Sequence, residues 1–292
     1  MRRYELSDVE WEMLSRYLPS AVTGGRPRQD DRRVLNGIVW KVRSGAPWRD
    51  VPDRYGSWQS VYTRFRRWAL DGTFARMLAG VQADADAAGD VEWLVSVDSS
   101  IVRAHQHAAG AARGRREPGE PDTGSAVAAA EPAHAIGRSR GGLTTKIHLA
   151  CDGAGRPLGF VLSGGNVNDC TRFTQVLETI HVARRGPGRA RVRPDHVIAD
   201  KGYSTNAIRH YLRRRGIGHT IPQRVDQQAN RRRRGSRGGR PPGFDPQRYK
   251  QRNVVERCFN RLKQCRSVAT RYDKTATSFQ ATVTIAALLQ WL

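Results

Sequence analysis

Hydrophobic residues in the first 80 positions recur three and four apart, which is the spacing of amphipathic helices. Ser7 and Glu10 form a capping-box pattern at the start of the first predicted helix. Further helices are predicted over 30–43 and 58–70, the second of them capped by Ser57. Their apolar stripes are Val34, Ile38 and Val42, and Val61, Phe65 and Trp68.

A short helical segment over 48–55 and a turn at Gly56 precede the predicted helix 58–70. That helix is basic on its remaining sides, where it carries Arg64, Arg66 and Arg67. A short helix, a turn and a basic amphipathic helix are typical of a helix-turn-helix that contacts DNA. An ordinary small helical bundle with solvated arginines gives the same pattern. We expect residues 1–85 to form a helical DNA-binding domain.

From residue 91 onward the pattern favours strands that alternate with helices. Apolar runs predict strands over 91–97, 143–150, 157–162, 196–199 and 219–222, and a turn at Asp152-Gly153 makes the second and third a hairpin. Helices are predicted over 171–182, 206–215 and 246–264, followed by an apolar C-terminal helix. The stretches 104–140 and 225–245 have no period and are predicted to be loops. The fold class is therefore α+β, with a mixed five-stranded sheet in a second domain over 91–292.

The net charge identifies a class of partner. Fifty Lys and Arg residues against 27 Asp and Glu give a net charge of +23. Such an excess favours double-stranded DNA as the partner, because each phosphate contact also releases a counterion. A codon bias towards Arg explains part of the arginine content but not the shortage of acids. The four cysteines lack zinc-ligand spacing, and no apolar run is long enough for a membrane span, so we expect a cytoplasmic protein without membrane partners.

Two of the acids follow apolar strands directly. Asp98 ends the run Leu94–Val97, and Asp200 ends the run Val197–Ala199. Neighbouring strands lie about 5 Å apart, so acids at two such ends can face one cleft. A buried carboxylate is costly without a counter-charge, and a divalent cation supplies one. Either acid alone could equally be a turn former at the end of a strand.

A third acid lies on a polar helix stripe. At about 100° per residue, Tyr249, Arg252, Glu256 and Lys263 fall within a sector of about 60°. One acid among bases fits a metal ligand flanked by groups that hold phosphates. The alternative is a surface helix with ion pairs four residues apart.

These residues resemble a known signature. The stripe resembles the Tyr-x2-Arg-x3-Glu-x6-Lys signature of DDE transposases from bacterial insertion sequences. The segment Asp200-Lys201-Gly202-Tyr203 resembles that around their second catalytic Asp, and Asp98-Ser99-Ser100 resembles that around the first. Four stretches are similar to the fifth insertion-sequence family: 25–28, 44–52, 137–148 and 165–169.

The resemblance implies a ribonuclease H-like catalytic domain in which Asp98, Asp200 and Glu256 are catalytic and hold two Mg²⁺ ions, with Mn²⁺ as a substitute. It implies cleavage at the element's ends and joining of the freed 3′-OH to target DNA by two-metal phosphoryl transfer. Tyr249, Arg252 and Lys263 would contact the terminal DNA, and Lys201 is a further candidate contact. The active form would be a homodimer or larger oligomer on DNA, in a bacterial cytoplasm at the nucleoid.

Two other functions use the same residues. A structure-specific nuclease would cleave without joining, and a retired transposase would serve as a DNA-binding repressor. Among the remaining candidates, His105 and His107 have metal-like spacing but no third ligand, and His148 reads as a packed or surface residue. The run Arg231–Arg234 reads as a loop that tracks phosphates or is merely solvated.

Overall fold

The computed structural model describes residues 4–20, 30–109 and 134–292. Its first helices are α1 (Asp8–Ser15), α2 (Asp31–Ser44), α3 (Trp58–Leu70) and α4 (Thr73–Ala87). The capping box predicted for the first helix is confirmed, because Ser7 Oγ accepts from Glu10 N and Glu10 Oε2 accepts from Ser7 N. Helix α2 ends at Gly45, which adopts φ 73°, a left-handed conformation that glycine tolerates. The segment 48–55 forms two short 3₁₀ turns, η1 (Trp48–Asp50) and η2 (Asp53–Tyr55).

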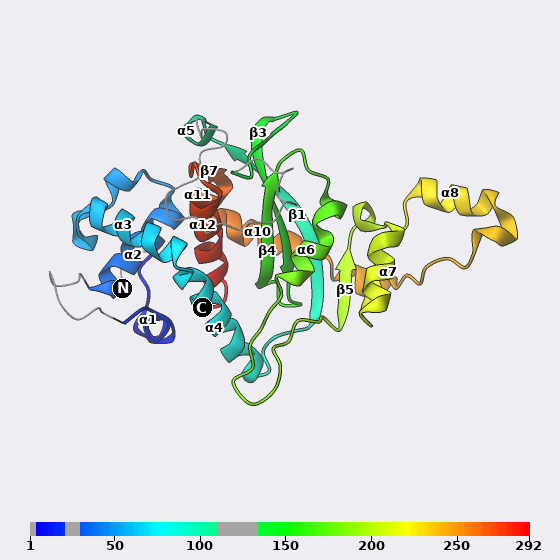
Figure 1. The fold of residues 1–292 in the computed structure, drawn as a ribbon, viewed down its shortest axis with the longest axis horizontal. Coiled ribbons are helices and arrows are strands. Elements are labelled where there is room, and N and C mark those ends of the chain that lie inside the picture. The colour runs from blue at the N-terminus through cyan, green and yellow to red at the C-terminus, as the bar shows by residue number, and fades with distance from the viewer. Residues whose placement is uncertain (1–3, 21–29, 110–133) are drawn as a thin grey trace.

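One mixed sheet forms the centre of the molecule (Figure 1). Its main strands are β1 (Leu94–Ala104), β3 (Gly142–Cys151), β4 (Pro157–Gly164), β5 (His196–Ala199) and β6 (Gly218–Thr220). They follow the order β4-β3-β1-β5-β6, antiparallel from β4 to β1 and parallel from β1 to β6. This is the ribonuclease H-like arrangement that the resemblance implied. Among the described residues the sheet has seven strands, not five, because short β2 (Gly137–Ser139) and β7 (Thr270–Arg271) pair with β3 and β1.

Strand β1 is longer than predicted. The sequence placed Asp98 at the end of a strand, whereas the strand continues to Ala104. The parallel partner β5 stops at the pair Val97↔Ala199, but antiparallel β3 pairs with β1 as far as Arg103↔Thr144. The prediction was wrong because Ser99 and Ser100 break the apolar run, while a partner strand still satisfies their backbone groups.

Both predicted loops contain regular structure. Most of 104–140 lies outside the described residues, but α5 (Gln106–Ala109) and β2 lie at its two ends. In the stretch 225–245, α8 (Val225–Arg233) and the turn η6 (Gly235–Gly238) replace the expected loop. The start of α8 is anchored by Gln227, whose amide donates to Ser204 O (2.9 Å) and whose Oε1 accepts from Ser204 Oγ (2.9 Å). This tertiary contact depends on one polar side chain, so the spacing of hydrophobic residues along the chain does not predict it.

Two predicted helices are divided or shortened. The helix predicted over 246–264 is split into α9 (Pro246–Lys250) and α10 (Asn253–Gln264) by a turn at 251–252. The helix predicted over 171–182 begins with the turn η4 (Asp169–Arg172) and ends with α6 (Phe173–Glu178). By contrast β5 matches its prediction residue for residue, and α7 (Asn206–Arg214), after the turn η5 (Lys201–Tyr203), is one residue shorter than predicted.

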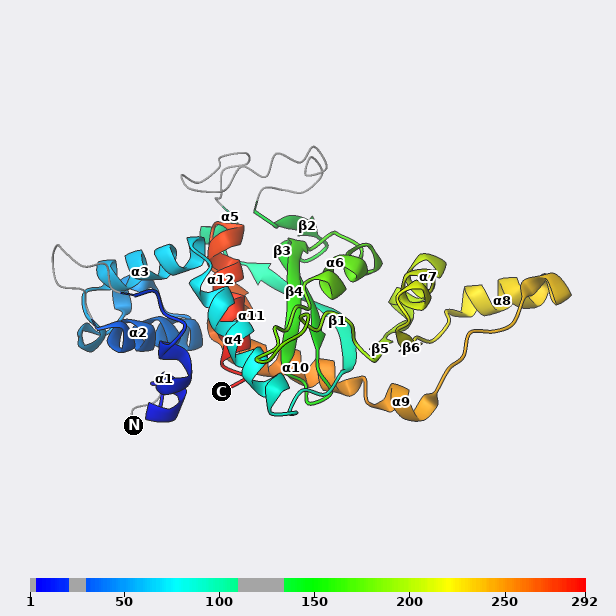
Figure 2. The same cartoon turned by 60° about the horizontal axis from the view of Figure 1, so that its bottom comes forward.

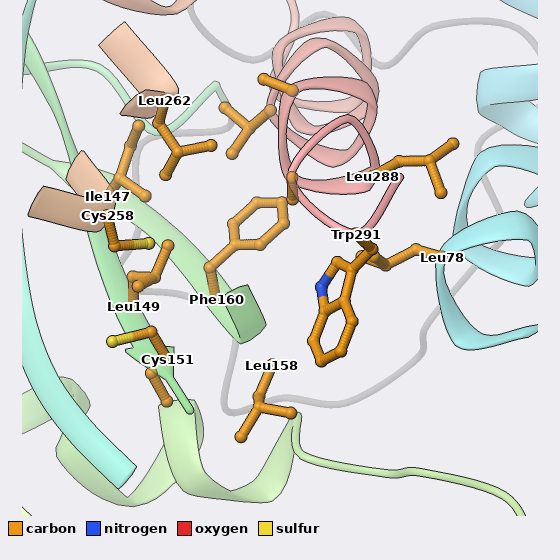
Figure 3. Close-up of a cluster of buried hydrophobic side chains, with 14 of the residues drawn as sticks. Leu78, Ile147, Leu149, Cys151, Leu158, Phe160, Cys258, Leu262, Leu288 and Trp291 are labelled. Atoms are coloured by element: carbon orange, nitrogen blue, oxygen red, sulfur yellow. The ribbon is translucent and has the colours of Figure 1, made fainter. Parts of the chain in front are cut away.

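The last helix, α12 (Ala276–Leu288), follows α11 (Arg266–Ala269) and lies between the N-terminal helices and the sheet (Figure 2). Buried side chains from α4, α10, α12 and the sheet form one hydrophobic core, part of which is drawn in Figure 3. The second face of the sheet is covered by α6, while α8 projects from the body (Figure 1). Within the described residues no helix is both long and apolar enough to cross a membrane. The boundary between domains 1–85 and 91–292 stays a prediction.

Candidate active site

The register of the central strands places the first two acids side by side. Val97 and Ala199 are the last paired residues of the parallel strands β1 and β5. Asp98 and Asp200 each follow directly, so they extend from neighbouring strands at the same edge. Asp200 Oδ1 accepts from Gly202 N (2.8 Å), which fixes its carboxylate at the start of η5.

Asp98 is largely enclosed and strongly influenced by its neighbours. Burial raises the pKa of its carboxyl group, and the negative charge of Asp200 raises it further. The Ser99 amide, which donates to Asp98 Oδ1 (2.8 Å), and the Arg252 guanidinium oppose this shift. Two carboxylates that share one edge of the sheet therefore require positive charge close by.

Arg252 connects Asp98 to the third acid. Its Nη1 donates to Asp98 Oδ2 (2.8 Å), and its Nη2 donates to Glu256 Oε1 (2.5 Å). Burial alone would lower the pKa of Arg252, but Asp98, Tyr249 and Glu256 leave it raised. Two of the three predicted acids, Asp98 and Glu256, thus share one guanidinium, and Asp200 follows the strand next to that of Asp98. Within the described residues no three side chains are close enough together to form a metal site as they stand.

Helix α10 lies along β1 and also places Lys263 on it. Lys263 Nζ donates to Ser100 Oγ (2.6 Å), and burial lowers the pKa of this amine. Arg252 and Lys263 therefore both contact β1, and Glu256 is joined to them through Arg252. Tyr249 lies on α9 with its ring 5.3 Å from that of Phe244, and Lys201 is exposed in η5.

A buried polar cluster lies behind Asp98, on the opposite face of β1. Lys146 Nζ forms an ion pair with Asp169 Oδ1 (2.8 Å) and donates to Val167 O (2.7 Å). His148 Nε2 lies 2.8 Å from Ser163 Oγ, and its Nδ1 lies 3.7 Å from Asp169 Oδ1. Lys146 and Asp169 come from the stretches 137–148 and 165–169, which resemble an insertion-sequence family. Nothing in the sequence of these stretches indicates that the two residues pair.

Tyr203 belongs to the same side of the sheet and joins the two halves of the site. Its ring packs 5.6 Å from Phe173, and its hydroxyl is buried close to Ser99. Burial raises the pKa of this phenol, and Asp98, Asp169 and Asp200 add to the shift. Tyr203 therefore sits among the acids of both faces, a place the sequence alone did not assign to it.

The buried imidazole of His148 predicts a pH-dependent stability. Burial lowers its pKa from 6.5 to about 4, although Asp169 opposes and Lys146 assists this shift. Below pH 6.5 the unfolded chain binds a proton at His148, whereas the folded chain does not bind it until the pH nears 4. The free energy of unfolding is therefore at its full value above pH 6.5 and declines as the pH falls towards 4. The loss in free energy of unfolding approaches about 3 kcal/mol. Urea denaturation between pH 4 and 7.5 measures it.

His148→Gln is the matched variant, because Gln retains a donor for Ser163 and does not titrate. Its unfolding free energy should fall less steeply with decreasing pH than that of the wild type. Equal slopes for the two proteins would show that His148 does not supply this dependence.

The N-terminal arginines differ in their surroundings. Arg64 is ion-paired with Asp31, and its guanidinium lies 5.3 Å from the Trp68 ring. Arg67 is exposed on α3, and Arg66 is partly buried. Val61, Phe65 and Trp68 are buried as predicted. The DNA contacts expected of Arg64, Arg66 and Arg67 stay predictions, and Arg64 already has a structural partner.

The rings of His105 and His107 lie 4.6 Å apart, and that of His105 lies 4.9 Å from Tyr272. These contacts account for both imidazoles as part of an aromatic group at the end of β1. Their metal-like spacing finds no third ligand among the described residues.

Comparison with protein families gives two matches along the chain. Residues 6–78 match the family described as "Putative transposase of IS4/5 family", and residues 89–291 match "Transposase DDE domain". Among curated proteins, one similar to this chain is the "Putative transposase for insertion sequence element IS6501" of Brucella ovis. It is 30% identical over 150 residues, which are 51% of this chain and 99% of the relative.

An uncharacterized protein of Sinorhizobium fredii, y4sN, is 44% identical over 111 residues, 38% of this chain and 85% of the relative. Among solved structures, the piggyBac transposase synaptic complex with hairpin DNA aligns over 98% of this chain and 72% of that one. The identity is 10% and the TM-score 0.42.

Proposed function

The chain belongs to the DDE transposase family, and on that premise we propose that it binds the terminal inverted repeats of its insertion sequence, cleaves DNA there and joins the freed 3′-OH ends to target DNA. The observation that carries this proposal is the register of β1 and β5, which sets Asp98 beside Asp200. Helix α10 then brings Glu256 to the same place through Arg252.

The residues present suit divalent cations. Carboxylate oxygens are the hard ligands that Mg²⁺ and Mn²⁺ prefer, and Asp98 and Glu256 already bind one positive group, Arg252, with Asp200 on the strand beside Asp98. We assign the three as the ligands. When bound, the ions would supply positive charge that activates the attacking oxygen and stabilises the leaving 3′ oxygen.

The bases around the acids are assigned to DNA. Arg252, once released from Asp98, can turn its guanidinium to a phosphate, for which its planar fork is well suited. Lys263, which contacts Ser100 of β1, Lys201, which directly follows Asp200, and Tyr249 are proposed as further contacts with the terminal DNA. A net charge of +23 supports double-stranded DNA as the partner, because its phosphates neutralise the excess of basic side chains. A homodimer or larger assembly would hold the two ends together.

Two rival functions make different predictions. A nuclease on this fold would cut the element's ends but leave the 3′-OH unjoined, and a repressor would bind the ends without cutting. A strand-transfer assay decides among them when it uses a plasmid target and DNA fragments carrying the sequences that flank the gene. Joined products support the proposal, whereas cut but unjoined ends favour the nuclease.

Replacing Arg66 and Arg67 with Ala is expected to weaken binding to the element's ends and to flatten its salt dependence. Each lost phosphate contact lowers the slope of log K against log salt concentration by roughly 0.9. Gel shifts at several salt concentrations measure both effects.

The matched control replaces Arg184 and Arg189, two exposed arginines of the loop before β5, with Ala. It removes the same charge far from α3 along the chain and should change binding less. End binding that is unchanged in the α3 variant would retire the helix-turn-helix assignment and leave a plain helical bundle.

A further inference from the structure

A pocket of about 530 Å³ lies between η1, the first turns of α3 and the segment 272–278. It is lined by part of the motif 44–52, which the proposed chemistry leaves without a role. Its aromatic and cationic lining residues include Trp48, Trp58, Tyr62, Tyr272, Arg49 and Lys274. Pockets of this volume commonly hold small organic ligands.

The aromatic wall of the pocket is rigid at its base and open at its rim. The Trp48 ring packs 5.3 Å from Tyr62 and 4.9 Å from Phe65, and Lys41 Nζ lies 5.1 Å from its centre. These contacts fix the position of the Trp48 ring. Trp58 is only partly buried, and Tyr272 is 38% exposed. A planar ligand can therefore enter and stack on the rim.

The pocket is positively charged. Arg49 is exposed with its guanidinium 5.6 Å from the centre of the Trp58 ring, and Lys274 is a second exposed cation of the lining. Asp273 is the acid among the lining residues, and its Oδ2 already accepts from Thr282 Oγ1 (3.0 Å). Flat rings beside cations suit a ligand with a planar base and a phosphate.

The pocket also lies within reach of DNA bound at the acids. Tyr272 directly follows β7, whose Arg271 pairs with Ala104 at the end of β1. From Asp98 to Ala104 the strand advances 104 − 98 = 6 residues, which is about 20 Å at 3.3 Å per residue. That is the length of roughly six nucleotides at 3.4 Å each.

We infer that this pocket binds one unpaired nucleotide of the DNA on which the protein acts. The base stacks against Trp58 and Tyr272, and Arg49 and Lys274 hold its phosphate. This inference rests on the proposed function and adds a binding site for single-stranded DNA about six nucleotides from the site of cleavage. A base inside a duplex is stacked on both faces by its neighbours and has no free face to offer, so the pocket discriminates against intact duplex.

The test is the binding of a fluorescein-labelled hexathymidylate to the full chain, followed by fluorescence anisotropy. A hexamer of abasic sugar phosphates carries the same charge without bases. The wild type should bind the base-bearing strand at least about 5-fold more tightly, and Trp58→Ala should remove this preference, because stacking on an aromatic residue supplies it. Trp58→Phe should retain most of it. Arg49→Gln combined with Lys274→Gln should weaken both hexamers equally.

Three results would overturn the inference. One is a Trp58→Ala protein that folds and still prefers bases. Another is an Arg49→Gln, Lys274→Gln protein with wild-type affinity for both hexamers. The third is a six-base-pair duplex that competes as well as the single strand. Cleavage is assayed separately on the same preparations. If the wild type shows base preference but never cuts or joins DNA, the proposed function fails and the pocket assignment stands.

Discussion

Glu256→Gln is expected to abolish DNA cleavage while leaving DNA binding intact or slightly stronger. Gln keeps the size and the hydrogen bond of Glu256 to Arg252 but removes a charge that the proposed cations need. Loss of several kcal/mol of transition-state stabilisation corresponds to a rate decrease of roughly 10³-fold or more. Binding should not suffer, because one negative charge near the phosphates is gone. A cleavage and strand-transfer assay beside a gel shift measures the two effects separately.

Two variants sharpen this experiment. Glu178→Gln removes the same charge from an exposed position on α6 and should cut at the wild-type rate. Lys263→Ala should instead weaken complex formation, with chemistry recovered at high protein concentration. Mn²⁺ should replace Mg²⁺, and Ca²⁺ should not support catalysis, because it coordinates loosely. A Glu256→Gln protein that cuts as fast as the wild type would rule out the proposed triad.

Arg271→Ala is expected to lower the free energy of unfolding by about 3–5 kcal/mol, because each buried hydrogen-bond acceptor left without its donor costs about 1–3 kcal/mol. Arg271 is fully buried, and burial lowers its pKa to about 10. It donates to Thr145 Oγ1 (2.6 Å) and to the carbonyl oxygens of Asp273 (2.9 Å) and Lys274 (3.1 Å). Its loss leaves these acceptors without a donor and loosens the segment that lines the aromatic pocket. Thermal and urea denaturation measure the change.

Arg213→Ala, at an exposed position on α7, is the matched control and should alter stability by less than about 0.5 kcal/mol. Arg271→Lys retains the charge but not the planar fork, so it should recover only part of the loss. An Arg271→Ala protein as stable as the Arg213→Ala protein would show that the buried guanidinium contributes nothing net to the fold.

Local pattern alone predicted the elements whose residues carry their own signal. The capping box at Ser7, the stripe of α3 and the apolar run of β5 each follow from side-chain period and cap chemistry. The stripe of bases around Glu256 followed from helical periodicity, although the turn at 251–252 places Tyr249 on α9 and Arg252 at the N-cap of α10. The mixed sheet followed from the order of strands and helices along the chain.

Tertiary structure decided whatever depends on a partner distant in sequence. Strand β1 extends past Asp98 because β3 pairs with it, and α8 begins where Gln227 meets Ser204. The bridge from Arg252 to Asp98 spans 154 positions, and no local period encodes such a contact. The sequence alone therefore determined which residues could do chemistry, and the pairing of strands determined which of them meet. The physical reason is that side-chain period acts within a few residues, whereas ion pairs and sheet hydrogen bonds form only after the chain has folded back on itself.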